Sequence, residues 1–257
     1  GEESHLARFR AESSFVYFTG FEEPSSVAVI RTGEQASYSL FVREKDPSVE
    51  IWDGERFGQE LAKKEFGADQ CFGVSELDEQ LPHLLRGAEK LYFAIGEDSA
   101  RDAIIFDARD RAQQLDRRSG RNKLPIFDPK EVVAPMRVIK DEHEITWLTD
   151  ACRLSAQAHI HVMKNVKPGM NERQAQAHLF FSFYHQEASF EGYSSIIASG
   201  SNACTLHYRD NNRLMEDGDF LLIDAGAEKN YYTADITRTY PVNGKFTSAQ
   251  KDIYQAV

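Results

Sequence analysis

The most constraining stretch of this sequence is residues 220–240, FLLIDAGAEKNYYTADITRTY, because it places two acids on one expected β-hairpin. Four apolar residues lead directly into Asp224, and Asp235 follows eleven positions later. If Lys229 and Asn230 form a two-residue turn, the returning strand pairs antiparallel and Asp224 lies directly opposite Asp235 on one face. Directly opposed Cβ atoms are about 4.5–5.5 Å apart, so two like charges there destabilise the sheet unless something neutralises them.

A divalent cation would neutralise this pair of acids. Carboxylate oxygens suit Mg²⁺, Mn²⁺ or Zn²⁺, and a bridging carboxylate can hold two ions about 3.5–4 Å apart. The apolar run before Asp224 favours this interpretation, because an unpaired carboxylate beside an apolar wall is costly. The alternative is that Asp224 ends a strand in water and Asp235 is its solvent-facing neighbour. The spacing alone leaves both alternatives open.

The residues before position 121 predict a mixed-sheet α/β domain, which sets the fold class as α/β (α+β). Short runs of β-branched and aromatic residues predict strands, and longer charged amphipathic runs predict helices. Strands are expected at 13–21, 25–33, 36–44 and 91–96, and helices at 54–68, 76–90 and 98–120. Residues 121–140 contain three prolines and no helical period. They predict a linker or an extended crossover.

Two long helices are expected to open the remaining segment, residues 141–257. Asp141 and Glu144 form a capping box at the start of the first helix, which Pro168 ends, and Asn171 can cap the second. The apolar positions at helical spacing are Ile145, Leu148, Cys152, Ile160, Met163, Leu179, Phe180 and Phe183. A last helix, capped by Ser248, is still running at the final residue, and the first residue is not methionine. Both ends are therefore expected to be cut.

Charge and cysteine usage narrow the classes of partner and the compartment. The net charge of −11 and the pI of about 5.2 argue against nucleic acid and anionic lipid surfaces as partners. Small or peptide-like partners are favoured instead. No apolar run approaches the roughly 18 residues of a membrane span. The three cysteines form no CxxC pair, which is typical of reduced thiols in a cytoplasmic protein.

Residues 222–246, LIDAGAEKNYYTADITRTYPVNGKF, closely resemble the central signature of the Xaa-Pro aminopeptidases, the aminopeptidase P family of "pita-bread" metallopeptidases. Further segments are similar to that family in the same order, namely 13–24, 41–58, 136–145 and 192–208. The resemblance implies a creatinase-like N-terminal domain at 1–120, a linker at 121–140 and the first half of a pita-bread catalytic domain at 141–257. It also implies a homo-oligomer, a dimer or tetramer.

The resemblance assigns roles to four residues. It makes Asp224 and Asp235 two ligands of a centre with two divalent metal ions, most often Mn²⁺ with Co²⁺ or Zn²⁺ as alternatives, and Asp235 the bridge. His207 matches the histidine that faces the scissile bond and helps to protonate the departing proline nitrogen, and Tyr193 matches a position that lines the site. The family's other ligands, a histidine and two glutamates, have no match in this chain, so the chain alone is not expected to be active.

The expected activity is metal-dependent removal of an N-terminal residue that precedes proline in a peptide. A prolidase-like Xaa-Pro dipeptidase is an alternative on the same scaffold. Metal-free pita-bread domains that bind peptides or proteins, and creatinase-like hydrolases, are two others, but neither needs both Asp224 and Asp235. Without the resemblance, His207 is best interpreted as a strand-end histidine bonded to backbone. The pairs His159 with His161 and His178 with His185 are not predicted to bind metal.

Overall fold

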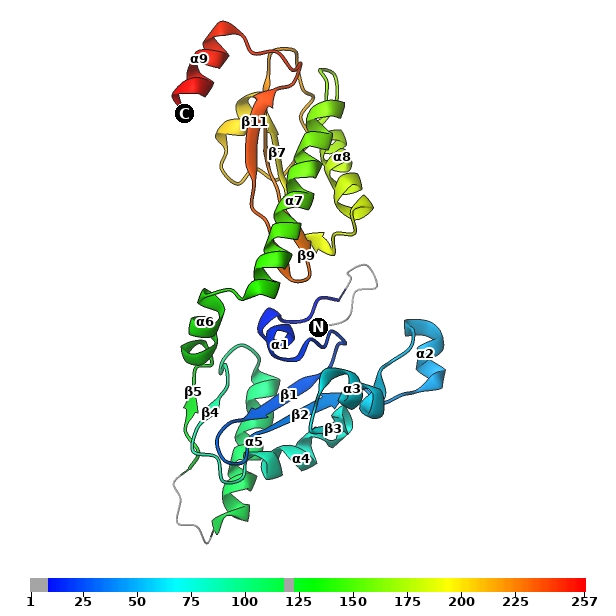
Figure 1. Ribbon diagram of the computed structural model, residues 1–257, viewed down its shortest axis with the longest axis vertical. Helices are drawn as coiled ribbons and strands as arrows, with labels where there is room; N and C mark the ends of the chain where they lie inside the picture. Colours follow the sequence, from blue (N-terminus) through cyan, green and yellow to red (C-terminus); the bar gives the residue numbers. More distant parts are fainter. Residues whose placement is uncertain (1–8, 118–122) are drawn as a thin grey trace. The chain divides into compact units, whose positions relative to one another are not determined.

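The computed structural model describes residues 9–117 and 123–257. These divide into two compact units, an N-terminal unit that ends at Val138 and a C-terminal unit, Ile139–Val257 (Figure 1). Each unit combines helices with a mixed or antiparallel sheet, as the α/β fold class requires.

The N-terminal unit is built on a three-stranded sheet with helices around it. Its elements are α1 (Ser13–Thr19), β1 (Val27–Arg31), β2 (Ser37–Val42), α2 (Pro47–Asp53), α3 (Gly58–Phe66), β3 (Gln70–Gly73), α4 (Leu77–Leu85), β4 (Leu91–Tyr92), α5 (Ser99–Leu115), β5 (Ile126–Phe127) and α6 (Lys130–Val138). Strand β2 pairs antiparallel with β1 and parallel with β3. The buried residues Phe21, Leu40, Val42, Ala62 and Ala68 form a core between this sheet and α3.

One of the strands expected in this unit is a helix. Residues 13–21 are expected to be a strand, but Ser13–Thr19 form α1, and β3 takes the third place in the sheet. The carboxylate of Glu12 accepts a hydrogen bond from the amide of Phe15 at 2.7 Å, and Gly20 closes the helix with a φ of 66°. These two caps outweigh the strand preference of the aromatic and β-branched side chains between them.

The expected linker, residues 121–140, contains regular structure in its described part. Strand β5 pairs parallel with β4, and helix α6 follows it, so this part is not an extended crossover. The limits of the two domains stay a prediction.

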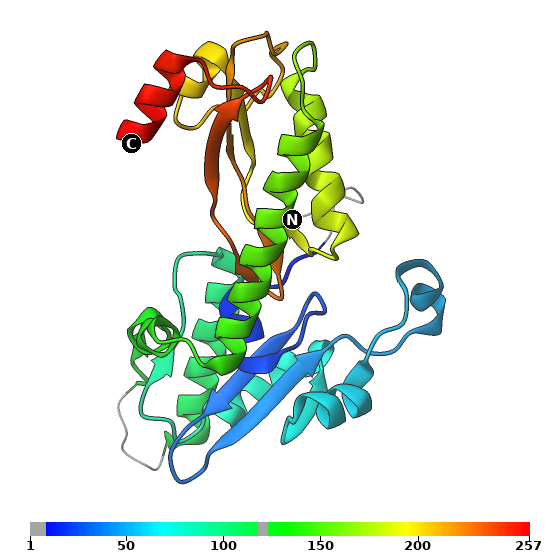
Figure 2. The ribbon, with the colours of Figure 1, turned by 45° about the horizontal axis from the view of Figure 1, so that its top comes forward.

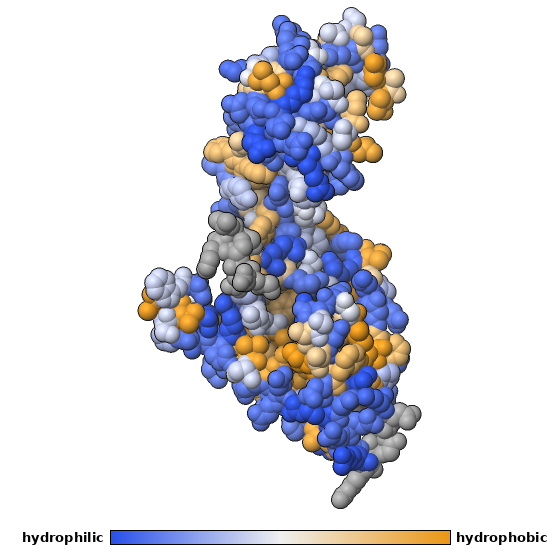
Figure 3. Space-filling model, turned by 180° about the vertical axis from the view of Figure 1, so that it is seen from behind, coloured by the Kyte–Doolittle hydropathy of each residue, from blue (hydrophilic) through white to orange (hydrophobic). Residues whose placement is uncertain are grey.

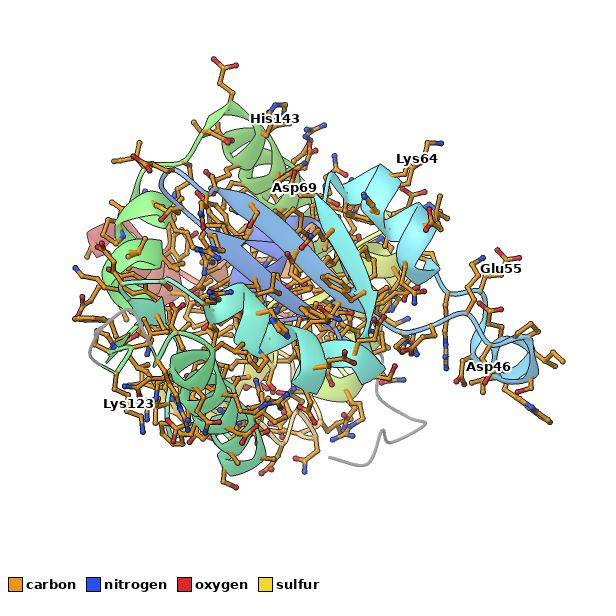
Figure 4. All side chains as sticks on the ribbon, turned by 90° about the horizontal axis from the view of Figure 1, so that it is seen from below. Asp46, Glu55, Lys64, Asp69, Lys123 and His143 are labelled. Carbon is orange, nitrogen blue, oxygen red and sulfur yellow. The ribbon has the colours of Figure 1, made fainter. Side chains whose placement is uncertain are left out.

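Helix α2 projects from the N-terminal unit between Asp46, its N-cap, and Glu55, both labelled in Figure 4.

The C-terminal unit packs two long helices against an antiparallel sheet. Its elements are α7 (Glu142–Asn165), α8 (Glu172–His185), β6 (Phe190–Glu191), β7 (Ile196–Ser199), the 3-10 helix η3 (Gly200–Cys204), β8 (Phe220–Asp224), β9 (Ala227–Lys229), β10 (Tyr232–Thr233), β11 (Thr237–Pro241) and α9 (Ser248–Ala256). The capping box of Asp141 with Glu144 and the Asn171 cap are confirmed. The N-cap of α9 is Thr247 rather than Ser248.

Strand β8 lies at the centre of the sheet, between β7 and β11, and β9 lies between β6 and β10. Helices α7 and α8 lie side by side against one face (Figures 1 and 2). Leu221 and Ile223 of β8 are fully buried in the core that these helices share with the sheet. Because side chains alternate along a strand, Asp224 points to the other face.

The core of this unit is formed by a different face of α7 from the expected one. Ile145, Cys152, Ile160 and Met163 are exposed, and the buried positions of α7 are Glu144, Ala151, Leu154, Ser155, Ala158, His159 and Val162. On α8 the expected face is confirmed, because Leu179 and Phe183 are buried and Phe180 packs against them. Three of these seven buried residues are small and two are the polar Glu144 and His159, so a search for large apolar side chains does not detect this face.

The change Leu179→Ala is expected to lower the free energy of unfolding of the C-terminal unit by about 2–5 kcal/mol, because Leu179 is 0% exposed and a cavity would remain. Ile160→Ala, on the 48% exposed Ile160, is the matched control and is expected to cost less than about 1 kcal/mol. Urea unfolding followed by the fluorescence of Trp147, in a Trp52→Phe background that removes the other tryptophan, measures both. If Ile160→Ala lowers the free energy of unfolding more than Leu179→Ala does, then Ile160 is buried and α7 packs with the apolar face that the sequence predicts.

The face shown in Figure 3 is mostly hydrophilic, and the hydrophobic residues on it gather in a few patches. Among the helices of the described residues, none combines the length and the apolar character that crossing a membrane requires.

Candidate metal centre

The candidate site lies at a break shared by three neighbouring strands of the C-terminal unit. Residues 192–195 separate β6 from β7, residues 225–226 separate β8 from β9, and residues 234–236 separate β10 from β11. The first of these interruptions contains Tyr193 and the third contains Asp235. Asp224 is the last residue of β8, directly before the second. The structure therefore brings together three of the four residues predicted for the site.

The hydroxyl of Tyr193 joins the two acids. It lies within hydrogen-bond distance of Oδ1 of Asp224 and is 3.0 Å from Oδ1 of Asp235, so it can donate its proton to either carboxylate. Burial, followed by these two hydrogen bonds, raises the pKa of Tyr193 above its ordinary value. The hydroxyl therefore stays protonated at neutral pH. The carboxylates remain accessible to solvent, because Asp224 is half-buried and Asp235 is exposed.

The register of the hairpin differs from the expected one by two residues. Asp224 pairs with Thr237, and the turn is formed by Asn230 and Tyr231, whose φ angles are 51° and 66°. Two positive φ angles are the signature of a type I′ turn, the turn that best matches the twist of a hairpin. The direct Asp224–Asp235 pairing is therefore wrong. Side chains alternate with a period of two, so the shift leaves both acids on the same face as diagonal neighbours.

Gly226 allows the strands to approach each other at the break. A Cβ atom on Gly226 would lie 1.7 Å from the carbonyl oxygen of Ala234, next to Asp235. The carbonyl of Gly226 also accepts a hydrogen bond from the amide of Gly192, next to Tyr193, at 2.8 Å. Only a residue without a side chain fits at this position. Gly226 therefore contacts both flanking segments, the one that carries Tyr193 and the one that carries Asp235.

His159 of α7 supports the site from the helix layer. It is 2% exposed, and its Nε2 lies 3.0 Å from the carbonyl oxygen of Ala225, the residue after Asp224. Burial, with a smaller effect of the Arg238 charge, lowers the pKa of His159 against the opposing effects of the Ala225 carbonyl and Asp224. A neutral ring donates from Nε2, which holds the backbone beside Asp224. His159 is not among the residues predicted from the sequence for this site.

Among the described residues, His207 forms no hydrogen bond or ion pair with Tyr193, Asp224 or Asp235. It is exposed, and within the part of the chain that the structure describes its ring has no hydrogen-bond partner. It follows η3, in a segment whose backbone is fixed by the buried carboxylate of Glu172, a residue that is also not among those predicted from the sequence. Its assignment to the site stays a prediction.

The donor set suits a hard divalent cation in part. Asp224 and Asp235 present carboxylate oxygens, the ligands that hard divalent cations prefer, on one accessible face. The hydroxyl of Tyr193 is the one hydrogen-bond donor that both carboxylates share. Within residues 9–117 and 123–257, no group of three or more His, Cys, Asp or Glu side chains is arranged to hold a metal ion. The two acids thus fit as members of a larger ligand set.

Comparisons with known proteins place this site in a known class of domain. Metallopeptidase family M24 matches residues 146–257, and the aminopeptidase P N-terminal domain matches residues 2–92. The fold and these two matches thus define an M24 metallopeptidase domain, part of the pita-bread fold, behind an aminopeptidase P N-terminal domain. With both domains in this order, the chain belongs to the aminopeptidase P family.

Individual relatives agree with this placement. The Xaa-Pro aminopeptidase of Escherichia coli is 40% identical over 251 residues, which are 97% of this chain and 57% of that protein. The human Xaa-Pro aminopeptidase 3 is 33% identical over 254 residues, 97% of this chain and 49% of that protein. The chain therefore spans about half the length of the curated relatives it matches.

Solved structures show the same fold. The structure of Zn-substituted E. coli aminopeptidase P in complex with product has a TM-score of 0.93 at 38% identity and covers 100% of this chain and 59% of that one. The structure of Pseudomonas aeruginosa aminopeptidase PepP has a TM-score of 0.91 at 38% identity, over 98% of this chain and 57% of that one. The family and the α/β fold class predicted from the sequence are confirmed.

Proposed function

We propose that the full-length protein is a metal-dependent Xaa-Pro aminopeptidase, which removes the N-terminal residue that precedes proline in a peptide. The observation that carries the proposal is the convergence of Asp224 and Asp235 on the Tyr193 hydroxyl in an M24 domain. Two like charges held together on an accessible face favour a cation between them. The E. coli relative at 40% identity supports the same activity.

In this proposal Asp224 and Asp235 would be ligands of two divalent metal ions, with Mn²⁺ as the native metal and Co²⁺ or Zn²⁺ as substitutes. The remaining ligands would come from the part of the domain that the relatives have beyond the matched region. When bound, such a pair of ions supplies a water nucleophile at neutral pH and stabilises the oxyanion. Tyr193 orients the two carboxylates, and His207 donates a proton to the departing proline nitrogen.

The proposed substrates are peptides with proline in the second position, whose tertiary amide offers no N–H to bind. We also propose that the protein acts in the cytoplasm as a homo-oligomer, a dimer or tetramer, and that it binds neither nucleic acid nor membrane. The charge of −11 supports the last two points. Sedimentation of the full-length protein tests the oligomeric state.

The activity is tested on metal-free full-length protein with and without added Mn²⁺. Release of the first residue is expected from Ala-Pro-Ala, only with metal, and not from Ala-Ala-Ala. Faster cleavage of the dipeptide Ala-Pro than of the tripeptide would favour the dipeptidase. If the verified full-length protein cleaves none of these peptides but retains them, the domain is a binding module and the proposed function is wrong.

A further inference from the structure

Glu172 is a fully buried acid outside the candidate metal centre. It is the first residue of α8, directly after the N-cap Asn171, and it is 0% exposed. An acid in the first turn is ordinary when it faces solvent and complements the helix dipole. A buried carboxylate is different, because it is costly unless hydrogen bonds replace its lost water.

Both oxygens of Glu172 are saturated by hydrogen bonds. Oε1 accepts from the amide of Ser199 at 2.6 Å, from its hydroxyl at 2.7 Å and from Nδ2 of Asn202 at 3.3 Å. Oε2 accepts from the hydroxyl of Tyr208 at 2.8 Å and from the amide of Arg213 at 2.9 Å. The two oxygens therefore hold different parts of one segment, residues 199–213, which we call the clasped segment: Oε1 holds its start and Oε2 its end.

The charge state of Glu172 agrees with these contacts. Burial alone would raise the pKa of Glu172, but the hydrogen bonds from Arg213 and Ser199 outweigh it and hold the pKa below its ordinary value. The group is therefore ionised at neutral pH. Hydrogen bonds to an ionised acceptor are stronger than neutral ones, so a single side chain can close the clasped segment.

His207 lies within the clasped segment, and its neighbour Tyr208 is one of the donors to Glu172. The His207 ring is exposed and, among the described residues, has no hydrogen bond of its own. Its location is therefore set by the backbone on either side of it. Arg173, next to Glu172, adds a hydrogen bond from Nη2 to the carbonyl of Asp210 at 2.8 Å. The start of α8, with its N-cap Asn171, thus holds the chain on the C-terminal side of His207 at four residues, namely Tyr208, Asp210, Asn212 and Arg213.

We propose that Glu172 is a positioning residue for His207, which closes the clasped segment and so holds the imidazole in its working place. The inference rests on the proposed function, because it assumes that His207 acts on the substrate. Glu172 itself does not touch the substrate. Its effect on the reaction passes through His207.

The first test asks, without an activity assay, whether Glu172 holds the clasped segment. Glu172→Gln keeps the size of the side chain but removes the charge and one acceptor oxygen. Backbone amide hydrogen exchange of the full-length protein, followed by mass spectrometry, is expected to speed up about tenfold or more over residues 203–212, since hydrogen bonds to charged groups are each worth a factor of that order. Tyr208→Phe removes one donor only, and a smaller increase in the same residues is expected.

Glu144→Gln is the matched control. Glu144 is also a buried glutamate in the first turn of a helix, 5% exposed and hydrogen-bonded to the amide of Asp141 at 2.8 Å, but it does not contact the clasped segment. Exchange over 203–212 is expected to stay unchanged in this variant. Two results would show that Glu172 does not hold the clasped segment. One is an equal rise in the exchange rate for Glu144→Gln and Glu172→Gln, and the other is no rise for Glu172→Gln and Tyr208→Phe.

The second test asks whether the effect on catalysis passes through His207. In the presence of His207, Glu172→Gln is expected to lower kcat about tenfold or more. In a His207→Ala background the same change is expected to lower kcat less than twofold, because no imidazole remains to be positioned. Glu144→Gln is expected to change kcat by the same factor in both backgrounds. A full additional loss for Glu172→Gln in the His207→Ala background would show a purely structural role and overturn the inference.

The two proposals fail in different ways. If the wild-type protein cleaves no Xaa-Pro peptide, the proposed function is wrong. The exchange measurement still decides whether Glu172 holds the clasped segment. A wild-type protein that cleaves such peptides, with normal exchange and normal kcat in Glu172→Gln and Tyr208→Phe, keeps the proposed function and removes the positioning role.

Discussion

Replacing Gly226 with alanine is expected to lower the free energy of unfolding of the C-terminal unit by about 3 kcal/mol or more. The added Cβ would lie 1.7 Å from the carbonyl oxygen and 2.4 Å from the carbonyl carbon of Ala234. Both are backbone atoms, so no side chain can rotate away. The strands must separate, and Asp235 then moves away from the Tyr193 hydroxyl and from Asp224.

Gly244→Ala is the matched control, because Gly244 has a φ of 72° with no atom within 4 Å of an added Cβ. It measures conformational strain without a clash, and a cost of about 1–2 kcal/mol is expected. The chain has two tryptophans, so a Trp52→Phe background leaves Trp147, beside Tyr232, as the reporter of the C-terminal unit in urea unfolding. If Gly226→Ala costs no more than Gly244→Ala, the close approach of the strands does not constrain this position.

The acid pair could be predicted from the sequence because it depends on side-chain parity rather than on the register itself. Placing the turn at Lys229–Asn230 gave a pairing two residues away from the observed one. An even shift keeps every side chain on its face, so Asp224 and Asp235 still lie together. The missed signal was Asn230, which tolerates the left-handed conformation at the first position of a type I′ turn.

The buried face of α7 could not be predicted from large apolar residues. Ala151 and Ala158 are fully buried, which allows α7 to pack closely against α8 and the sheet, whereas Ile145 and Ile160 face outward. Ser155 and His159 lie on the same buried face, four residues apart, and each bonds the backbone that follows Asp224: Ser155 Oγ accepts from the amide of Ala227 at 2.9 Å. Two polar residues four apart, on the same helical face as Ala151 and Ala158, are the signal that could have identified this support.

Glu172 escaped detection for a different reason. From the sequence, an acid at the start of a helix is explained by the helix dipole alone, and nothing local shows that it is buried. Its partners are 27 to 41 residues away in the chain, from Ser199 to Arg213. A contact of this kind is visible only after the strands and η3 have been placed.

Replacing Asp235 with asparagine is expected to reduce the Mn²⁺-dependent peptidase activity of the full-length protein at least about 100-fold, because loss of even an outer partner of a metal ligand costs that order of affinity or activity. Stability should change in the opposite sense in the absence of metal. Asparagine removes one of two like charges that share the Tyr193 hydroxyl, so the metal-free variant is expected to be as stable as the wild type or more stable.

Mn²⁺ reverses this order of stability if the acids bind it. At a free concentration of 100 times Kd, a bound ion stabilises the folded wild type by about 2.7 kcal/mol, and the Asp235→Asn variant gains much less. Thermal unfolding with and without Mn²⁺ measures the crossover, and Asp252→Asn, at an exposed acid of α9, is expected to behave as the wild type does in both conditions. A variant that merely damages the fold would be less stable with and without metal. Full activity and an unchanged Mn²⁺ shift in Asp235→Asn would show that this acid pair does not hold the catalytic metal.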